Sequence, residues 1–327
     1  MTKLHRREAG TQAARRIACA QITDALRALE RRPLSDGDVH SARKSLKKAR
    51  AMLRLLRPSI GDRAYRRENT LLRDAARPLS AVRDAKVLLQ RLERLQRCLR
   101  ARGGPSPPVE LQRILRRERI DLRRKLSRDS KPFAGQLEVL REGRGRARRW
   151  RVGRKGWSLL GAGLARVYTQ ARRARSRAEA DQTAETLHEW RKQTKYLWHL
   201  LQVLEPLGAP VGRLAQTAHG IADALGEDHD LWVLRARIAT GVAARAGRRR
   251  LLSLIERRST QLRARAFALG RRLYADSGPA FEARLHALWR AWRRKPHART
   301  AAGELRSSSA SRAGSTPRPS SGGRGQR

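Results

Sequence analysis

The sequence is poor in the features that would mark several common classes of protein. Its two cysteines, Cys19 and Cys98, are far apart in apolar helical patterns, so we interpret them as reduced thiols without a disulfide or metal partner. The longest apolar stretch, residues 157–165, has nine residues, against the roughly 20 that cross a bilayer. The charged first seven residues show no secretory signal. We therefore expect a cytoplasmic protein without a membrane span.

Negative charge is also scarce. The 327 residues include 29 Asp and Glu against 76 Lys and Arg, which leaves a net charge of +47. A surplus of this size opposes compaction through self-repulsion, and it indicates a polyanionic partner. With 39% apolar residues the chain can still build a core, which excludes a wholly disordered basic tail.

No segment alternates in the manner of a strand. Apolar residues recur at spacings of three and four from Gly10 to Arg294, which predicts an all-α fold. Proline and glycine predict breaks between the helices at residues 32–37, 58–61, 103–108, 143–156, 206–212 and 277–279. Residues 296–327 are rich in Ser, Gly, Pro and Arg, and we expect this tail to be disordered. The tail carries only +5 of the net charge, so the charge belongs to the folded part.

One pattern occurs twice. Residues 39–47 (VHSARKSLK) match residues 187–195 (LHEWRKQTK) at an offset of 148, with the shared form apolar-His-x-x-Arg-Lys-x-x-Lys. A second pair, residues 79–88 and 225–234, follows at an offset of 146. We predict a short extension (1–9), a first helical half (10–140), a linker (141–155) and a second helical half (156–295) before the tail. The two halves are expected to form pseudo-symmetric helical bundles.

The repeated helix has two faces. At 100° per residue its basic residues form one stripe, and its apolar residues lie on the opposite side. The stripe is made by His40, Arg43, Lys44, Lys47 and Arg54 in the first copy, and by His188, Arg191, Lys192, Lys195 and His199 in the second. The apolar side is made by Val39, Ala42, Leu46, Ala49, Leu53 and Leu56, and by Leu187, Trp190, Leu197, Leu201 and Leu204.

Solvated surface is the ordinary explanation of such a stripe, but three features oppose it here. The spacing recurs, and no carboxylate occurs between Val39 and Pro58 for helical ion pairs. Five of the 11 lysines fall within these two short windows, although arginine outnumbers lysine about sixfold in the chain. A mixed stripe of Arg, Lys and His suits phosphates that lie at varied angles. From His40 to Arg54 it is about 21 Å long at 1.5 Å per residue, which favours an extended anion.

This order of motifs, with Arg83-Asp84 and Val87-Leu88 downstream, resembles the CHAD family of conserved-histidine α-helical domains over roughly residues 10–295. The resemblance implies binding of inorganic polyphosphate in a basic groove or pore between the two bundles, and an association with polyphosphate granules. It implicates His40, Arg43, Lys44, Lys47, Arg50 and Arg83 in the first half, and His188, Arg191, Lys192 and Lys195 in the second. The sequence departs from the pattern at Trp198, which replaces the equivalent of Arg50, and at His229, which replaces that of Arg83.

Two other functions are open to this sequence. A charge of +47 holds nucleic acid without specificity, and Trp198 borders the stripe where a base would stack. The segment Glu227-Asp228-His229-Asp230 suggests a metal phosphohydrolase, but its counterpart in the first half keeps only Asp84. Asp84 and Asp230 fit a helix N-terminal or salt-bridging role. We expect a binding protein that is not an enzyme and has no metal or cofactor.

Overall fold

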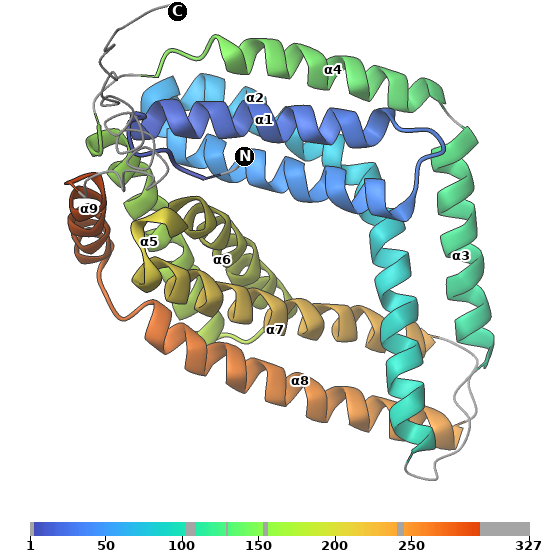
Figure 1. The fold of residues 1–327 in the computed structure, drawn as a ribbon. Helices are drawn as coiled ribbons and strands as arrows, with labels where there is room; N and C mark the ends of the chain where they lie inside the picture. The colour runs from blue at the N-terminus through green and yellow to red at the C-terminus, as the bar shows by residue number, and fades with distance from the viewer. Residues whose placement is uncertain (1–2, 102–108, 129, 153–155, 241–244, 295–327) are drawn as a thin grey trace, which may run out of the picture. The chain divides into compact units, whose positions relative to one another are not determined.

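The computed structural model describes residues 3–101, 109–128, 130–152, 156–240 and 245–294. In these ranges every regular element is a helix, which confirms the all-α prediction (Figure 1). The α-helices are α1 (Gly10–Glu30), α2 (Asp36–Arg100), α3 (Val109–Arg128), α4 (Ser130–Arg148), α5 (Ser158–Ala180), α6 (Ala184–Leu204), α7 (Ala209–Thr240), α8 (Arg245–Leu273) and α9 (Gly278–Arg294). The predicted break at 103–108 and the predicted disordered tail lie outside the described residues.

The two helices that carry the repeated motif both begin at a side-chain cap. The Ser35 hydroxyl accepts a hydrogen bond from the Asp38 amide (3.1 Å), and the Asp38 carboxylate accepts one from the Ser35 amide (3.0 Å). At the start of α6, the Thr183 hydroxyl accepts from the Thr186 amide (3.2 Å). These caps satisfy amides that have no partner within the helix, and they fix where the basic stripes begin.

Helix α2 reverses direction at Gly61, within the predicted break at 58–61. Gly61 has a φ of +79°, which is the left-handed region that glycine tolerates best. Hydrogen bonds then join residues on its two sides: Arg50 Nε donates to Asn69 (3.1 Å), and Arg54 Nη1 donates to the Tyr65 hydroxyl (2.7 Å). Residues 19 apart would be about 28 Å apart along a straight helix. The segments 36–60 and 62–100 therefore form an antiparallel hairpin.

A second reversal joins α6 to α7. A short 3₁₀ turn (Glu205–Leu207) leads to Gly208, whose φ is +123°, and α7 then packs back along α6. Each copy of the basic motif is thus followed by a turn at a glycine with positive φ. That the two complete halves are pseudo-symmetric bundles remains a prediction from the sequence.

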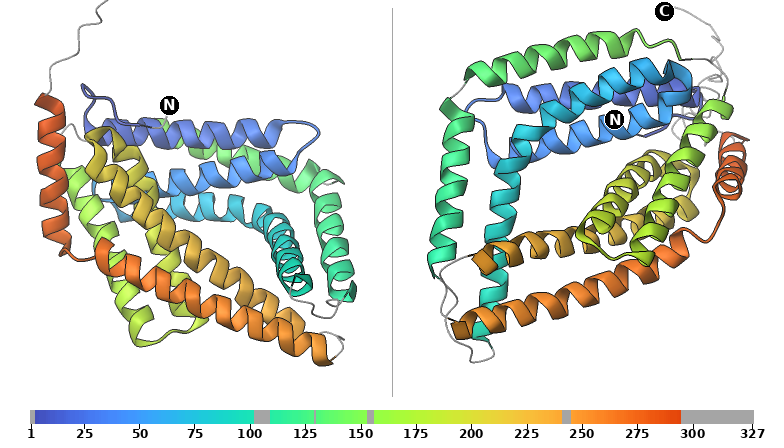
Figure 2. Two further views of the ribbon diagram at one scale, coloured as in Figure 1. Left: turned by 60° about the horizontal axis from the view of Figure 1, so that its bottom comes forward. Right: turned by 180° about the vertical axis from the view of Figure 1, so that it is seen from behind.

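The helices pack in two groups that α2 connects (Figures 1 and 2). Helix α1 lies along α2 and is covered by α4, while α5, α6, α7 and α8 pack in succession. Helix α2 also contacts α5, α6 and α7. All the apolar-side residues predicted for the two stripe helices are buried, Trp190 among them. Burying these faces leaves the two basic stripes on the remaining sides of α2 and α6.

The predicted break at residues 143–156 is wrong over its first part, because α4 continues to Arg148 through Gly143 and Gly145. Tertiary contacts outweigh the low helix propensity of glycine here. Arg146 Nε donates to the buried Glu68 carboxylate (2.8 Å), and a Cβ at Gly143 would lie 3.1 Å from the Leu71 side chain. The first eight residues of the predicted linker 141–155 are thus helical and pack against α2.

Gly163 allows α5 to approach α2 closely. A Cβ at this position would collide with the backbone carbonyl of Leu55. We expect Gly163→Ala to destabilise the fold by about 1–3 kcal/mol in denaturant unfolding, since backbone cannot yield as a flexible side chain does. Gly145→Ala, a helical position with open space around it, is the control and should be neutral or stabilising. Equal stability of Gly163→Ala and the unaltered protein would disprove the close packing.

Among the described helices, none has the length and apolar character needed to cross a bilayer.

Candidate functional site

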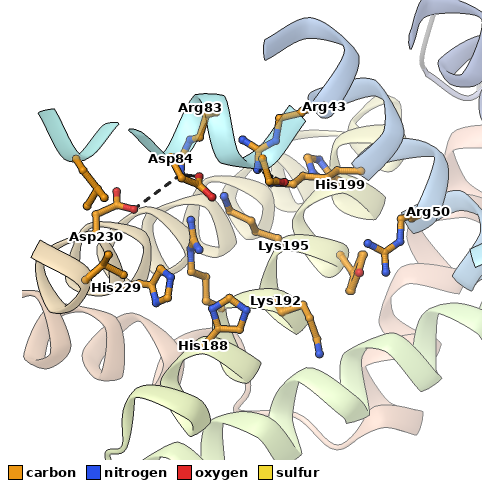
Figure 3. A pocket seen from close by; sticks show the side chains of 16 residues that line it. Arg43, Arg50, Arg83, Asp84, His188, Lys192, Lys195, His199, His229 and Asp230 are labelled. Carbon is orange, nitrogen blue, oxygen red and sulfur yellow. Dashed lines mark hydrogen bonds and ion pairs between the residues drawn. The ribbon is translucent and has the colours of Figure 1, made fainter. Parts of the chain in front are cut away.

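A cavity of about 390 Å³ lies where the α2 hairpin faces α6 and α7. Side chains from all three helices converge on it (Figure 3). Helix α2 contributes Arg43, Lys47, Arg50, Ser80, Arg83, Asp84 and Leu88; α6 contributes His188, Arg191, Lys192, Lys195, Tyr196 and His199; and α7 contributes His229, Asp230 and Val233. The repeated motif is therefore present on both walls, once from α2 and once from α6.

Nine of the twelve predicted site residues line this cavity. Three do not. His40 and Lys44 are exposed on α2 outside the lining, nearer its N-terminus. Arg54 is turned toward two tyrosines, with its guanidinium carbon 3.9 Å from the centre of the Tyr196 ring and its Nη1 bonded to Tyr65. The stripe predicted on α2 is thus divided into a part that faces the cavity and a part that faces solvent.

The cavity is strongly positive. Its lining contains seven Lys and Arg side chains and two carboxylates, Asp84 and Asp230. Neither Lys47 nor Lys195 has an ion pair with any described residue. Lys192, in contrast, pairs with Glu189 on the same helix. The cavity therefore holds two lysines whose charge is not balanced by the part of the chain that the structure describes.

Burial without an ion-pair partner among the described residues lowers the pKa of both lysines. Burial, and after it repulsion from Arg43 and Lys195, lowers the pKa of Lys47 to about 6. Burial, and after it repulsion from Arg191 and Arg83, lowers the pKa of Lys195 to about 8. At pH 7 Lys47 is mostly neutral and Lys195 mostly charged. An anion in the cavity would favour the charged form of both.

Two arginines on opposite walls have unused hydrogen-bonding capacity. Arg43 donates from Nη2 to the Ser80 hydroxyl (3.1 Å), but its Nε is buried without a hydrogen-bond partner, and so is the Nε of Arg191. Burial lowers the pKa of both guanidinium groups, yet arginine stays charged in proteins at neutral pH. These groups are suited to bind oxygen atoms of an anion in a fixed, forked geometry.

The two aspartates of the lining hold Arg83. Arg83 Nη1 is 3.0 Å from Asp84 Oδ1 and 3.8 Å from Asp230 Oδ1, so one guanidinium bridges carboxylates of α2 and α7. Of the two roles suggested by the sequence, this supports salt bridging. The helix N-terminal role is wrong, because both residues are well inside their helices.

The histidines differ in their surroundings. The rings of His188 and His229 are 4.9 Å apart at the cavity, and burial lowers the pKa of both. His199 is buried, which lowers its pKa to about 3 and keeps it neutral. Its ring stacks on Trp198 with centroids 4.7 Å apart, and Trp198 meets His219 at 4.3 Å. Trp198, expected to border the stripe, is thus held within a cluster of rings.

The cavity lining also contains residues to which the sequence pattern assigns no binding role, namely Ser80, Asp84, Leu88, Tyr196, His229, Asp230 and Val233. The signal for some of them was present, since Asp84 and Asp230 occupy equivalent places in the second repeated segment. Leu88 and Val233 gave no such signal, because an apolar residue in a helical pattern is ordinarily a core residue. Among the described residues there is no group of three His, Cys, Asp or Glu placed to hold a metal ion.

Comparison with known proteins finds one family model and solved structures of similar fold. A model of the CHAD domain family matches residues 16–239, well over half of the chain. A solved structure of PptA from Streptomyces chartreusis is similar with a TM-score of 0.60 at 16% identity, over 82% of this chain and 100% of that one. The CHAD domain from the plant Ricinus communis gives 0.55 at 17% identity, over 87% and 94%. These likenesses concern the fold. No protein of curated function matches the sequence.

Proposed function

This chain belongs to the CHAD domain family, and on that premise we propose that it binds linear inorganic polyphosphate in the cavity between α2, α6 and α7. The observation that carries the proposal is the pair Lys47 and Lys195, which are partly buried and have no ion pair with any residue that the structure describes. Buried lysines are rare in proteins unless something pairs with them. A polyanion in the cavity supplies that charge from outside the chain.

The shape of the surroundings favours a linear polymer over a compact anion. A second hollow, lined by Arg83, Val87, Gln90, Arg91, Glu93, Arg94 and Arg97, shares Arg83 with the cavity. It follows the second segment of α2 for about 21 Å at 1.5 Å per residue. A third hollow shares Arg91 and Arg94 with the second and adds Arg257 and Arg258 of α8. A long chain that fills the cavity can therefore continue past Arg83 onto a row of arginines.

A direct titration tests the proposal. Long-chain polyphosphate added to the intact chain at physiological salt should bind saturably in calorimetry. A variant that replaces Lys44, Lys47, Lys192 and Lys195 together by alanine should bind far more weakly, however the binding free energy is divided among the four lysines. Undiminished affinity of this quadruple variant at the same salt concentration would exclude the cavity as the site, because general electrostatic attraction alone would then explain binding.

Affinity should depend on pH in a defined direction. Lys47, surrounded by Arg43, Arg83, Arg191 and Lys195, has a pKa of about 6 in the free protein, and a bound polyanion raises it. Binding then takes up a proton, so affinity should increase up to about tenfold per pH unit as the pH falls from 8 to 6. Titration in two buffers of different ionisation enthalpy measures this uptake. Lys47→Met should remove nearly one proton from it, and a pH-independent affinity would refute the assignment.

We also propose that binding occurs without turnover. Asp84 and Asp230, the carboxylates of the cavity, are both engaged by Arg83, which leaves no unpaired carboxylate in the lining to act as a general base. Incubation with polyphosphate and divalent metal should release no orthophosphate.

Inside a cell, we propose that the protein associates with polyphosphate granules. A fluorescent fusion should follow the granules and become diffuse in cells that make no polyphosphate.

A further inference from the structure

Part of the cavity surface is not explained by an inorganic ligand. Leu88 and Val233 are part of the lining, although polyphosphate has no apolar group to place against them. One residue before Val233 on α7 stands Trp232, with 46% of its surface exposed. The other six tryptophans of the chain are buried or half-buried. A single exposed apolar side chain is common on proteins, so its position relative to the cavity decides its meaning.

Trp232 belongs to a row of flat rings that leads out of the cavity. The His188 and His229 rings, both in the lining, have centroids 4.9 Å apart. The Trp232 ring follows, 6.3 Å from that of His229 and within 17° of its plane. Burial lowers the pKa of His229, which favours the neutral form of this ring. The exposed indole is thus the outer end of a row whose inner end lies among the phosphate-binding cations.

The His188 ring is tilted by 52° from that of His229, so only the His229 and Trp232 rings are near-parallel. The exposed indole at the end of this pair is a surface on which a nucleobase can stack. Such stacking contributes about 1–3 kcal/mol per base and tolerates any base, since each has a π-face. The cations that would hold phosphates, Lys195 and Arg191, lie on α6 in the same lining as His229. A ligand with a phosphate chain at one end and a flat heterocycle at the other matches both surfaces.

We propose that this cavity also binds nucleoside polyphosphates, with the phosphate chain among the α6 cations and the base stacked on Trp232. The inference rests on the proposed phosphate site and adds a ligand class to it. Inorganic polyphosphate and a nucleotide then compete for the same cations, and only the nucleotide has a base that stacks on the Trp232 indole.

Comparison of ATP with inorganic tripolyphosphate tests this directly, because both carry three phosphates. In metal-free buffer ATP should bind about 5- to 150-fold more tightly, which is the stacking free energy expressed as an affinity ratio. Trp232→Leu should abolish that advantage, leave tripolyphosphate affinity unchanged and remove ATP-induced quenching of tryptophan fluorescence. Lys195→Met, the matched control, should weaken both ligands by the same factor.

The outcomes separate the two proposals. If ATP binds no more tightly than tripolyphosphate, or if Trp232→Leu keeps the advantage, the nucleotide inference is overturned while polyphosphate binding stands. If neither ligand binds and long-chain polyphosphate does not bind either, both proposals fall. A circular dichroism spectrum and melting curve of Trp232→Leu that match the unaltered protein ensure that a loss of ATP affinity reflects the missing indole.

Discussion

Lys195→Met should weaken the binding of long-chain polyphosphate at pH 7 by about 10- to 100-fold, since a charge-assisted hydrogen bond contributes about 1.5–3 kcal/mol. The same change should raise the melting temperature of the free protein. The pKa of Lys195, about 8, is below the ordinary lysine value, so the charged amine destabilises the folded state. This destabilisation grows as the pH falls from 10.5 to 8. Methionine has a similar length and no charge to bury.

Opposite signs for affinity and stability identify a residue kept for binding. Lys47→Met should behave in the same way, but with a different dependence on pH. The pKa of Lys47 is about 6, so at pH 8 part of the binding free energy that its ammonium contributes is spent on protonating the amine. Replacing Lys47 should therefore reduce the affinity for polyphosphate most below pH 6. Lys44→Met is the matched control three residues away, exposed and outside the lining, and should change affinity less than twofold. If Lys44→Met weakens binding as much as Lys47→Met, binding follows the whole stripe and not the cavity.

The second large effect concerns chain length. Reversing the charge of Arg94 and Arg97 together should weaken binding of long-chain polyphosphate by about 10- to 100-fold, at about 0.5 kcal/mol for each of the two lost contacts and a similar amount for each of the two new repulsions. Tripolyphosphate, which fits within the cavity, should bind as before. Both arginines line the second hollow, and neither has an ion pair with a described residue.

A charge-matched variant separates this path from general attraction. Arg249 and Arg250 are exposed on α8 and line none of the three hollows, so reversing them changes net charge equally without touching the path. Gel-shift or anisotropy titrations with chains of defined length compare the two variants at one salt concentration. Equal losses in both would mean that net charge alone governs the affinity for long chains.

The sequence predicted the helices and the motif because both depend on local periodicity. The three- and four-residue spacing requires that Leu46 and Leu197 face a core and that Lys47 and Lys195 face away from it. Helical spacing alone does not say what lies opposite. His40 and Lys44 share the stripe with Lys47, yet the α2 hairpin at Gly61 and the approach of α6 place only part of the stripe at the cavity.

Other features depended on contacts between distant segments. Gly143 and Gly145 indicated a break, but the ion pair between Arg146 and the buried Glu68, 78 residues earlier, holds α4 as a helix there. A tryptophan in a helical pattern is ordinarily a core residue, yet the structure places Trp232 outside, beside His229. The lowered pKa values of Lys47 and Lys195 likewise arise from burial by helices far apart in the sequence.

Competition with duplex DNA tests the central claim most directly. Lys47, Lys195 and the unpartnered Nε atoms of Arg43 and Arg191 lie in a cavity of about 390 Å³, which a thin phosphate chain can enter and a duplex is far too wide to enter. At physiological salt and equal phosphate concentration, duplex DNA should leave labelled long-chain polyphosphate bound. If DNA displaces the polyphosphate, the cavity is not the site, and the charge of +47 binds any polyanion alike.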